Sequence, residues 1–135
     1  MDLRRLDHVV LAVRDLRAGA GAWAGILGLR PEPPFTPEGS HMQLAALPLS
    51  GDSAFIELVQ PTTPGHRVAV HLDQVGEGMF SISLHVGDLA AAVAELKEKG
   101  VPVSGPERGA LPNTRVARIP RDAAHGVAIQ LIERW

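Results

Sequence analysis

Two stretches of the chain share one pattern of apolar and polar residues. The first reads LDHVVLAVRDL over Leu6–Leu16, and the second reads MFSISLHVGDL over Met79–Leu89. Each begins with a run that is typical of a strand and ends near an aspartate that suits the N-cap of a helix. Their offset of 73 positions also carries Ile56-Glu57-Leu58 onto Ile129-Gln130-Leu131. Two separate segments with one offset indicate an internal repeat of two similar halves.

Each half is expected to form a βαβββ module. The fold class is α+β, with two tandem βαβββ modules related by a pseudo-dyad and curved mixed sheets that form a cleft. We expect a single domain over residues 1–135, with module one at 1–60, a connector at 61–78 and module two at 79–135. The predicted strands are Leu6–Val13, His41–Leu47, Ala54–Val59, Met79–Val86, Arg115–Ile119 and Val127–Glu133, and the predicted helices are Leu16–Leu27, Leu89–Lys99 and a short one within Gly65–Val75.

The first predicted helix contains three glycines, Gly19, Gly21 and Gly25, each of which costs up to ~1 kcal/mol relative to alanine. They either permit close packing of this helix or make it soft, and we favour close packing. Gly28 is expected to end it.

Strand alternation separates side chains that pack beneath the helices from those on the opposite face. In the first half, His8 and Glu57 fall on the face away from the helix, and Gln43 is expected to share it. In the second half, this face carries Ser81, Ser83, His85 and Gln130. Because unpaired polar groups are costly within a strand, this recurrence predicts that the face lines a cleft.

Composition narrows the classes of partner. The net charge is −2 with no basic stripe, which argues against nucleic acid, and no apolar run approaches the ~20 residues that span a membrane. The absence of cysteine excludes disulfides and thiol nucleophiles and favours a cytoplasmic location. Six histidines and 15 acidic residues leave a metal site with oxygen and nitrogen ligands open.

The order and spacing of the motifs resemble the vicinal oxygen chelate superfamily, which includes glyoxalase I, methylmalonyl-CoA epimerase, extradiol dioxygenases and bleomycin resistance proteins. The chain is most similar to the methylmalonyl-CoA epimerase-like branch, and the resemblance covers nearly all of it. The motifs that carry it are LDHVVLAVRDL, IELVQP at Ile56–Pro61, GEGMFSISLHVGDLAAAVAELKEKGV at Gly76–Val101 and HGVAIQLIE at His125–Glu133. The resemblance also implies a homodimer.

The resemblance implies a metal site in which four side chains from four strands bind one divalent ion. His8 and Glu57 match two of these ligands, whereas Ser81 stands where the family has a histidine and Gln130 where it has a glutamate. A reduced metal set of His8, Glu57 and Gln130 with water would hold nickel, cobalt, zinc or manganese weakly. Gln43 falls where the epimerase branch places a catalytic glutamate.

Two functions are consistent with these residues. The first is metal-assisted isomerase, epimerase or lyase chemistry on a small carbonyl or thioester compound, with Glu57 or His85 as the base. In this function, Gln43, Ser81, Ser83 and Gln130 would contact the substrate. The second is metal-free binding or sequestration of a small molecule, as in bleomycin resistance proteins, so the sequence leaves open whether the protein is an enzyme.

Simpler structural roles are also open for the candidate residues. Glu57 could pair with a nearby basic side chain, and His8 could be a hydrogen-bonded histidine in a cleft. The histidines near turns or in the connector are expected to be solvated; they are His41, His66, His71 and His125.

Overall fold

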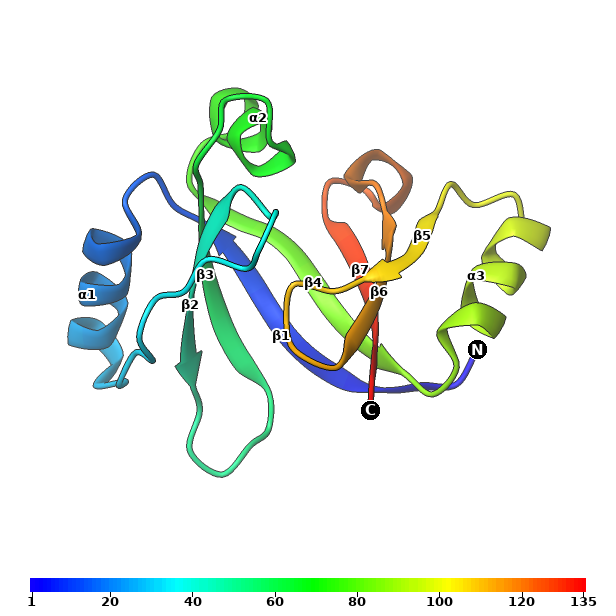
Figure 1. Ribbon diagram of the computed structural model, residues 1–135, viewed down its shortest axis with the longest axis horizontal. Coiled ribbons are helices and arrows are strands. Elements are labelled where there is room, and N and C mark those ends of the chain that lie inside the picture. Colours follow the sequence, from blue (N-terminus) through cyan, green and yellow to red (C-terminus); the bar gives the residue numbers. More distant parts are fainter. The chain divides into compact units, whose positions relative to one another are not determined.

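The computed structural model describes all residues 1–135 and divides them into two compact units. The central unit is His8–Phe80, and the terminal unit combines Met1–Asp7 with Ser81–Trp135. The boundary falls inside two strands, β1 (Leu3–Ala12) and β4 (Gly78–Val86), which Figure 1 shows in blue and green. The division therefore follows packing rather than the linear order of the repeat, and the predicted connector lies within the central unit.

The central unit has the strand order β2-β3-β1, with β2 at Met42–Pro48 and β3 at Phe55–Pro61. β3 pairs in parallel with β1 and antiparallel with β2. Helix α1 (Leu16–Leu27) covers one face, and α2 (Arg67–Gln74) packs against β3 (Figure 1). The apolar cluster on the α1 side includes Leu11, Val13, Leu16, Ala20, Ala45, Leu47 and Leu58.

The terminal unit has the strand order β4-β7-β6-β5, with β5 at Ser104–Arg108, β6 at Thr114–Ile119 and β7 at Ala128–Arg134. Helix α3 (Leu89–Glu98) covers one face, and the short 3-10 helix η1 (Arg121–Ala124) precedes β7. The buried cluster here is Val86, Leu89, Ala92, Val93, Leu96, Ala117, Ile119 and Leu131. This unit shows the complete βαβββ succession. In the central unit, the first strand after the helix is reduced to a bridge between Phe35 and Leu44.

The internal repeat includes the hydrogen bonds at the N-termini of α1 and α3. Asp15 and Asp88 are the N-caps of α1 and α3, and each accepts a hydrogen bond from the amide three residues later. Gln60 Oε1 accepts from the first helical amide of α1 at 2.8 Å, and Glu133 Oε1 accepts from that of α3 at 3.3 Å. Both pairs of acceptors are 73 positions apart, so the repeat conserves how each helix starts.

The glycines of α1 serve different purposes. A Cβ at Gly19 would lie 3.1 Å from a methyl carbon of Val13, so this position does need a small residue. Gly21 and Gly25 face open space, and the interpretation of close packing was wrong for them. Gly28 ends the helix as predicted, in the left-handed conformation with φ 68°.

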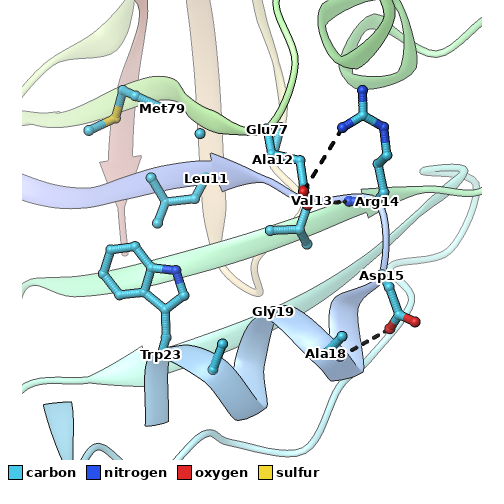
Figure 2. A pocket seen from close by; sticks show the side chains of 12 residues that line it. Leu11, Ala12, Val13, Arg14, Asp15, Ala18, Gly19, Trp23, Glu77 and Met79 are labelled. Atoms are coloured by element: carbon cyan, nitrogen blue, oxygen red, sulfur yellow. Dashed lines mark hydrogen bonds and ion pairs between the residues drawn. The ribbon is translucent and has the colours of Figure 1, made fainter. Parts of the chain in front are cut away.

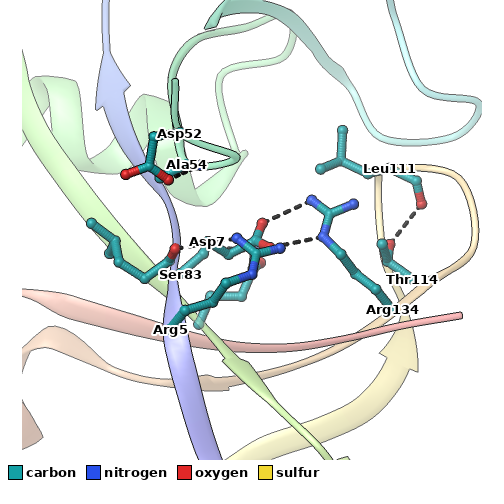
Figure 3. Close-up of polar contacts among 10 residues, drawn as sticks. Arg5, Asp7, Asp52, Ala54, Ser83, Leu111, Thr114 and Arg134 are labelled. Atoms are coloured by element: carbon teal, nitrogen blue, oxygen red, sulfur yellow. Dashed lines mark hydrogen bonds and ion pairs between the residues drawn. The ribbon is translucent and has the colours of Figure 1, made fainter. Parts of the chain in front are cut away.

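An ion cluster around the buried Asp7 carboxylate ties β1 to β7, the last strand of the terminal unit (Figure 3). The Asp7 side chain is 1% exposed and accepts two hydrogen bonds from Arg134, from Nε and Nη2, both at 2.8 Å. Arg5 approaches the same carboxylate at 3.1 Å. This bidentate geometry is the strong form of an arginine–carboxylate contact.

No helix combines the length and apolar character that crossing a lipid bilayer requires.

Candidate functional site

The face of the central sheet opposite α1 carries two buried polar side chains, His8 and Glu57. In the parallel pair of β1 and β3, His8 lies opposite Phe55 and Val10 lies opposite Glu57, so His8 and Glu57 are diagonal neighbours. His8 is 2% exposed and its ring stacks on Phe55, with centroids 4.6 Å apart. Glu57 is 7% exposed. The predicted face of both residues is confirmed, and their chemical roles stay predictions.

A buried carboxylate such as Glu57 costs free energy unless hydrogen bonds or positive charge compensate for its lost hydration, and Arg67 is one source of positive charge within electrostatic reach. Arg67 is the first residue of α2, the helix that packs against β3. Surrounding protein lowers the pKa of the Arg67 guanidinium, and the Glu57 carboxylate opposes this shift. An arginine still remains protonated at neutral pH, so the charge persists.

Two histidines of the predicted connector, residues 61–78, make ordered contacts in and around α2. His66 is the N-cap of α2, and its Nδ1 accepts a hydrogen bond from the Val68 amide at 3.1 Å. His71 is buried, and its ring meets that of Phe80 edge-on with centroids 5.1 Å apart. The expectation that these two histidines are solvated was wrong, because α2 packs against the sheet and draws both into ordered contacts.

The polar face of the terminal unit contains the remaining predicted residues, Ser81, Ser83, His85 and Gln130. In the parallel pair of β4 and β7, Ser83 lies opposite Gln130. Gln130 Nε2 donates a hydrogen bond to the fully buried Ser83 Oγ at 2.9 Å. Ser81 is buried and His85 is half-buried. The predicted face is confirmed here, because the alternate residues Leu84, Val86, Ile129 and Leu131 pack with the α3 cluster.

Gln43 does not lie on the face of Glu57. Along the antiparallel pair of β2 and β3, Gln43 is opposite Gln60, while Ala46 is opposite Glu57. Ala45 packs beneath α1, so Gln43, two residues away on the same strand, shares the α1 side and is exposed. The prediction was wrong because the run MQLAALP has no clear polar alternation from which its register could be deduced. The structure therefore removes the geometric basis for grouping Gln43 with Glu57 as a substrate contact.

The donors on these faces do not fit a divalent metal ion. In neither unit do three or more histidine, aspartate or glutamate side chains gather so that they could hold a metal. Glu57 lies within electrostatic reach of Arg67, and Gln130 lies opposite Arg118 of β6. Positive charge within reach of Glu57 disfavours a second cation there, whereas the Arg118 guanidinium is already paired with Glu107. We therefore derive no chemical step through a metal.

A separate pocket of about 740 Å³ lies on the α1 side of the central unit (Figure 2). Trp23, Leu11 and Met79 give it an apolar lining. At its rim, the Arg14 amide donates to Glu77 Oε2 at 3.0 Å, and the Arg14 guanidinium donates to the Leu72 carbonyl. None of the site residues predicted from the sequence lines this pocket, so we place the candidate site on the Glu57 face instead.

Comparison with known proteins shows the family of this chain. Residues 7–117 match the family model described as Glyoxalase/Bleomycin resistance protein/Dioxygenase superfamily. An ethylmalonyl-CoA/methylmalonyl-CoA epimerase of Cereibacter sphaeroides is 33% identical over 102 residues, which is 75% of each chain.

Solved structures of methylmalonyl-CoA epimerases are similar over nearly the whole chain. The enzyme from Mycobacterium tuberculosis has a TM-score of 0.89 and 29% identity, covering 99% of this chain and 90% of that one. A methylmalonyl-CoA epimerase in complex with methylmalonyl-CoA and NH4+ has a TM-score of 0.88 and 27% identity, covering 98% and 95% of the two chains.

Proposed function

Because the chain belongs to the glyoxalase, bleomycin resistance protein and dioxygenase superfamily, we propose that it moves a proton at the carbon next to the carbonyl of an acyl-CoA thioester. The observation that carries this proposal is the buried Glu57 carboxylate beside His8 on the sheet face opposite α1. Relatives named as methylmalonyl-CoA epimerases support the thioester as the substrate class. The reaction class is epimerisation or isomerisation without a metal.

In the proposed reaction, Glu57 is the base. The bond between the α-carbon and its hydrogen breaks, the proton goes to a Glu57 oxygen, and the electron pair delocalises to the carbonyl oxygen as an enolate. Returning the proton to the same face regenerates the substrate. Inversion needs a second proton donor on the other face of the enolate; His85 as a base, and Ser81, Ser83 and Gln130 as substrate contacts, stay predictions from the sequence.

Exchange of the α-hydrogen in deuterated water tests the role of Glu57. Wild-type protein with methylmalonyl-CoA is expected to incorporate deuterium, as followed by mass spectrometry. Glu57→Gln is expected to lower the exchange rate by about 100-fold or more, the usual contribution of a general base. Its melting temperature should stay equal or rise, because the variant no longer buries a charge.

Glu38→Gln is the matched control, because Glu38 is an exposed glutamate of the same unit. It should change neither the exchange rate nor the melting temperature. A Glu57→Gln protein that melts several degrees lower and keeps its exchange rate would show instead that Glu57 only balances Arg67.

Binding without catalysis is the second candidate function. The replacement of two family ligands by Ser81 and Gln130 favours it, since sequestration needs no base or metal. Wild-type protein that binds the thioester in a calorimetric titration but shows no deuterium exchange would support this function.

A further inference from the structure

One exposed side of helix α1 is apolar. Ala18, Ala22 and Ile26 follow one another at intervals of four residues, so they lie along one side of the helix, and all three are exposed. Ile26 is 79% exposed. These three residues form the outer α1 face, and Figure 1 shows α1 at the edge of the central unit. A surface helix normally carries charged and polar residues on its exposed side.

The other copy of the repeat shows that the fold does not require an apolar surface at this place. Helix α3 starts 73 residues after α1, has an equivalent aspartate cap and also packs one side on a sheet. Its C-terminal part is charged where α1 is not: the positions of Glu95, Glu98 and Lys99 correspond to Ala22, Gly25 and Ile26. A contiguous exposed apolar surface indicates that another molecule covers it.

The pocket beside α1 continues the outer α1 face. Ala18 and Ala22 belong to both, and Gly19 also lines the pocket. On its far side lie Leu11 and Met79 (Figure 2). Along α1, the chain therefore presents a projecting isoleucine next to an apolar depression of about 740 Å³. A surface that carries both features can bind a copy of itself.

A twofold axis across the middle of α1 makes the two features complementary. If the axis passes between Ala22 and Trp23, two copies of α1 run antiparallel, and Ile26 of each copy lies opposite Gly19 of the other, at the pocket. The small side chains of the face allow the helix axes to approach to about 8 Å, the short end of the usual range. The antiparallel direction also places opposite ends of the two helix dipoles together.

Charges at the two ends of α1 fit the same arrangement. At the N-terminal end, the exposed Asp15 uses one carboxylate oxygen to accept from the Ala18 amide. Just past the C-terminal end, Arg30 is exposed and makes no hydrogen bond or ion pair within the chain. Asp15 and Arg30 lie equally far along the chain from the axis, so Arg30 of each copy comes to the Asp15 end of the other. This charge complementarity favours a second copy over an unrelated partner.

We propose that two copies of this chain bind each other through the outer α1 face, with antiparallel α1 helices and with Ile26 of each copy in the pocket of the other. The resemblance to the superfamily implies a homodimer, and this inference assigns an interface to it. The inference does not rest on the proposed function, since His8 and Glu57 lie on the opposite face of the sheet.

Sedimentation velocity over a range of protein concentrations tests the interface. Wild-type protein is expected to form a dimer that dissociates on dilution. Ile26→Lys introduces the residue that α3 has at the equivalent position, so the helix should still form. We expect the variant to weaken the dimer by about 100-fold or more, because the interface would bury two unpaired ammonium groups.

Charge reversal tests the antiparallel direction. Arg30→Glu places a second acid at the Asp15 end of the other copy, so it should weaken the dimer by about fivefold or more, and less at high salt. Arg17→Glu is the matched control, because Arg17 lies about 140° around the helix from Ala22. It should leave the dimer within about twofold of the wild type.

The absence of cysteine from the chain allows a direct test of the axis. Ala22→Cys places one thiol beside the axis, where the same thiol of the other copy is within the Cα separation of about 7 Å that a disulfide permits. Mild oxidation should give a covalent dimer on a non-reducing gel. Val70→Cys is the matched control at an exposed position of α2 in the same unit, and it should stay monomeric on the gel.

The results decide both the surface and the axis. Dissociation by Ile26→Lys together with the Ala22→Cys crosslink would support the inference. Wild-type protein that is monomeric at every concentration tested, or a dimer that Ile26→Lys leaves intact, would overturn it. A dimer that Ile26→Lys disrupts but that Ala22→Cys does not crosslink would contradict the antiparallel arrangement.

Discussion

Glu57 and Gln130 occupy equivalent positions of the repeat, as do His8 and Ser81, each pair 73 residues apart. In the central unit, the pair is a carboxylate and an imidazole with an arginine nearby. In the terminal unit, it is an amide and a hydroxyl, and the amide is bonded to Ser83. The two halves therefore share a backbone frame but differ in charge at the positions that matter for chemistry.

Restoring the charged residues in the terminal unit tests this comparison. Ser81→His with Gln130→Glu places an imidazole and a carboxylate on the adjacent strands β4 and β7, in the register that His8 and Glu57 have in the central unit. We expect the affinity for cobalt or nickel to rise by more than about tenfold, or ~1.4 kcal/mol, in a calorimetric titration. Gln130→Glu alone is the control and should gain less. Equal affinity in the double variant and the wild type would mean that the two positions do not converge as ligands.

The sequence predicts which residues share a sheet face only in strands where polar and apolar residues alternate clearly. His8 and Glu57 could be placed because each is a polar residue between apolar neighbours in a strand. Gln43 was misplaced because its strand gives no such signal. Arg67 was not singled out, since it lies in a connector helix and its relation to Glu57 depends on how α2 packs against β3, which no local pattern encodes.

Among the elements, helix starts could be predicted better than strand partners. Asp15 and Asp88 were identified as N-caps because an aspartate after a strand can satisfy free helical amides, which is a local property. The additional acceptors Gln60 and Glu133 come from distant strands and could not be identified in this way. The short helix in the connector was predicted, but its histidine cap and its burial against the sheet were not.

The outer face of α3 gives a prediction of pH dependence. A hydrogen bond from Lys99 to Glu95, followed by one from the Met1 amino group, lowers the pKa of Glu95 from 4.5 to about 2. Because the pKa is lower in the folded state, the contribution of Glu95 to stability is present above pH 4.5 and is lost as the pH falls toward 2.

Carboxyl NMR titration of Glu95 checks the shift directly, and thermal melts check its consequence. The melting temperatures of Glu95→Gln and wild type should differ at neutral pH and converge as the pH is lowered through this window. A Glu95 carboxyl that titrates near its ordinary value would contradict the ion pair with Lys99.

At the scale of the whole molecule, the repeat predicts two modules in linear order, whereas packing divides the chain differently. Residues 1–7 belong to the terminal unit, although they lie in the first module by sequence. Residues 79–80 belong to the central unit, although they open the second module. Sequence similarity between halves shows that they have related structures, but it does not show which half a given strand end packs with.

The Asp7 cluster makes this arrangement testable, because it links residues 7 and 134 at opposite ends of the chain. Asp7→Asn removes the charge-assisted hydrogen bonds from Arg134 and the ion pair with Arg5, so we expect a loss of about 1.5 kcal/mol or more in the free energy of unfolding by urea. Asp73→Asn, at an exposed position, should stay within about 0.5 kcal/mol of the wild type. Equal stability of the two variants would mean that the cluster contributes little to the terminal unit.

The reciprocal assignment of strand ends has a consequence for how such a chain can arise. Consider a half-length ancestor with one module. The start of its first strand would pack with the unit of another copy, so its own unit would need the corresponding strand end from that copy. Two copies could satisfy each other only by swapping those ends, at a stability that depends on their concentration. Fusing the copies makes the swap intramolecular. After fusion, the two repeat-related positions of a site residue are encoded separately and can change independently. One half can then carry a glutamate, as at Glu57, and the other a glutamine, as at Gln130.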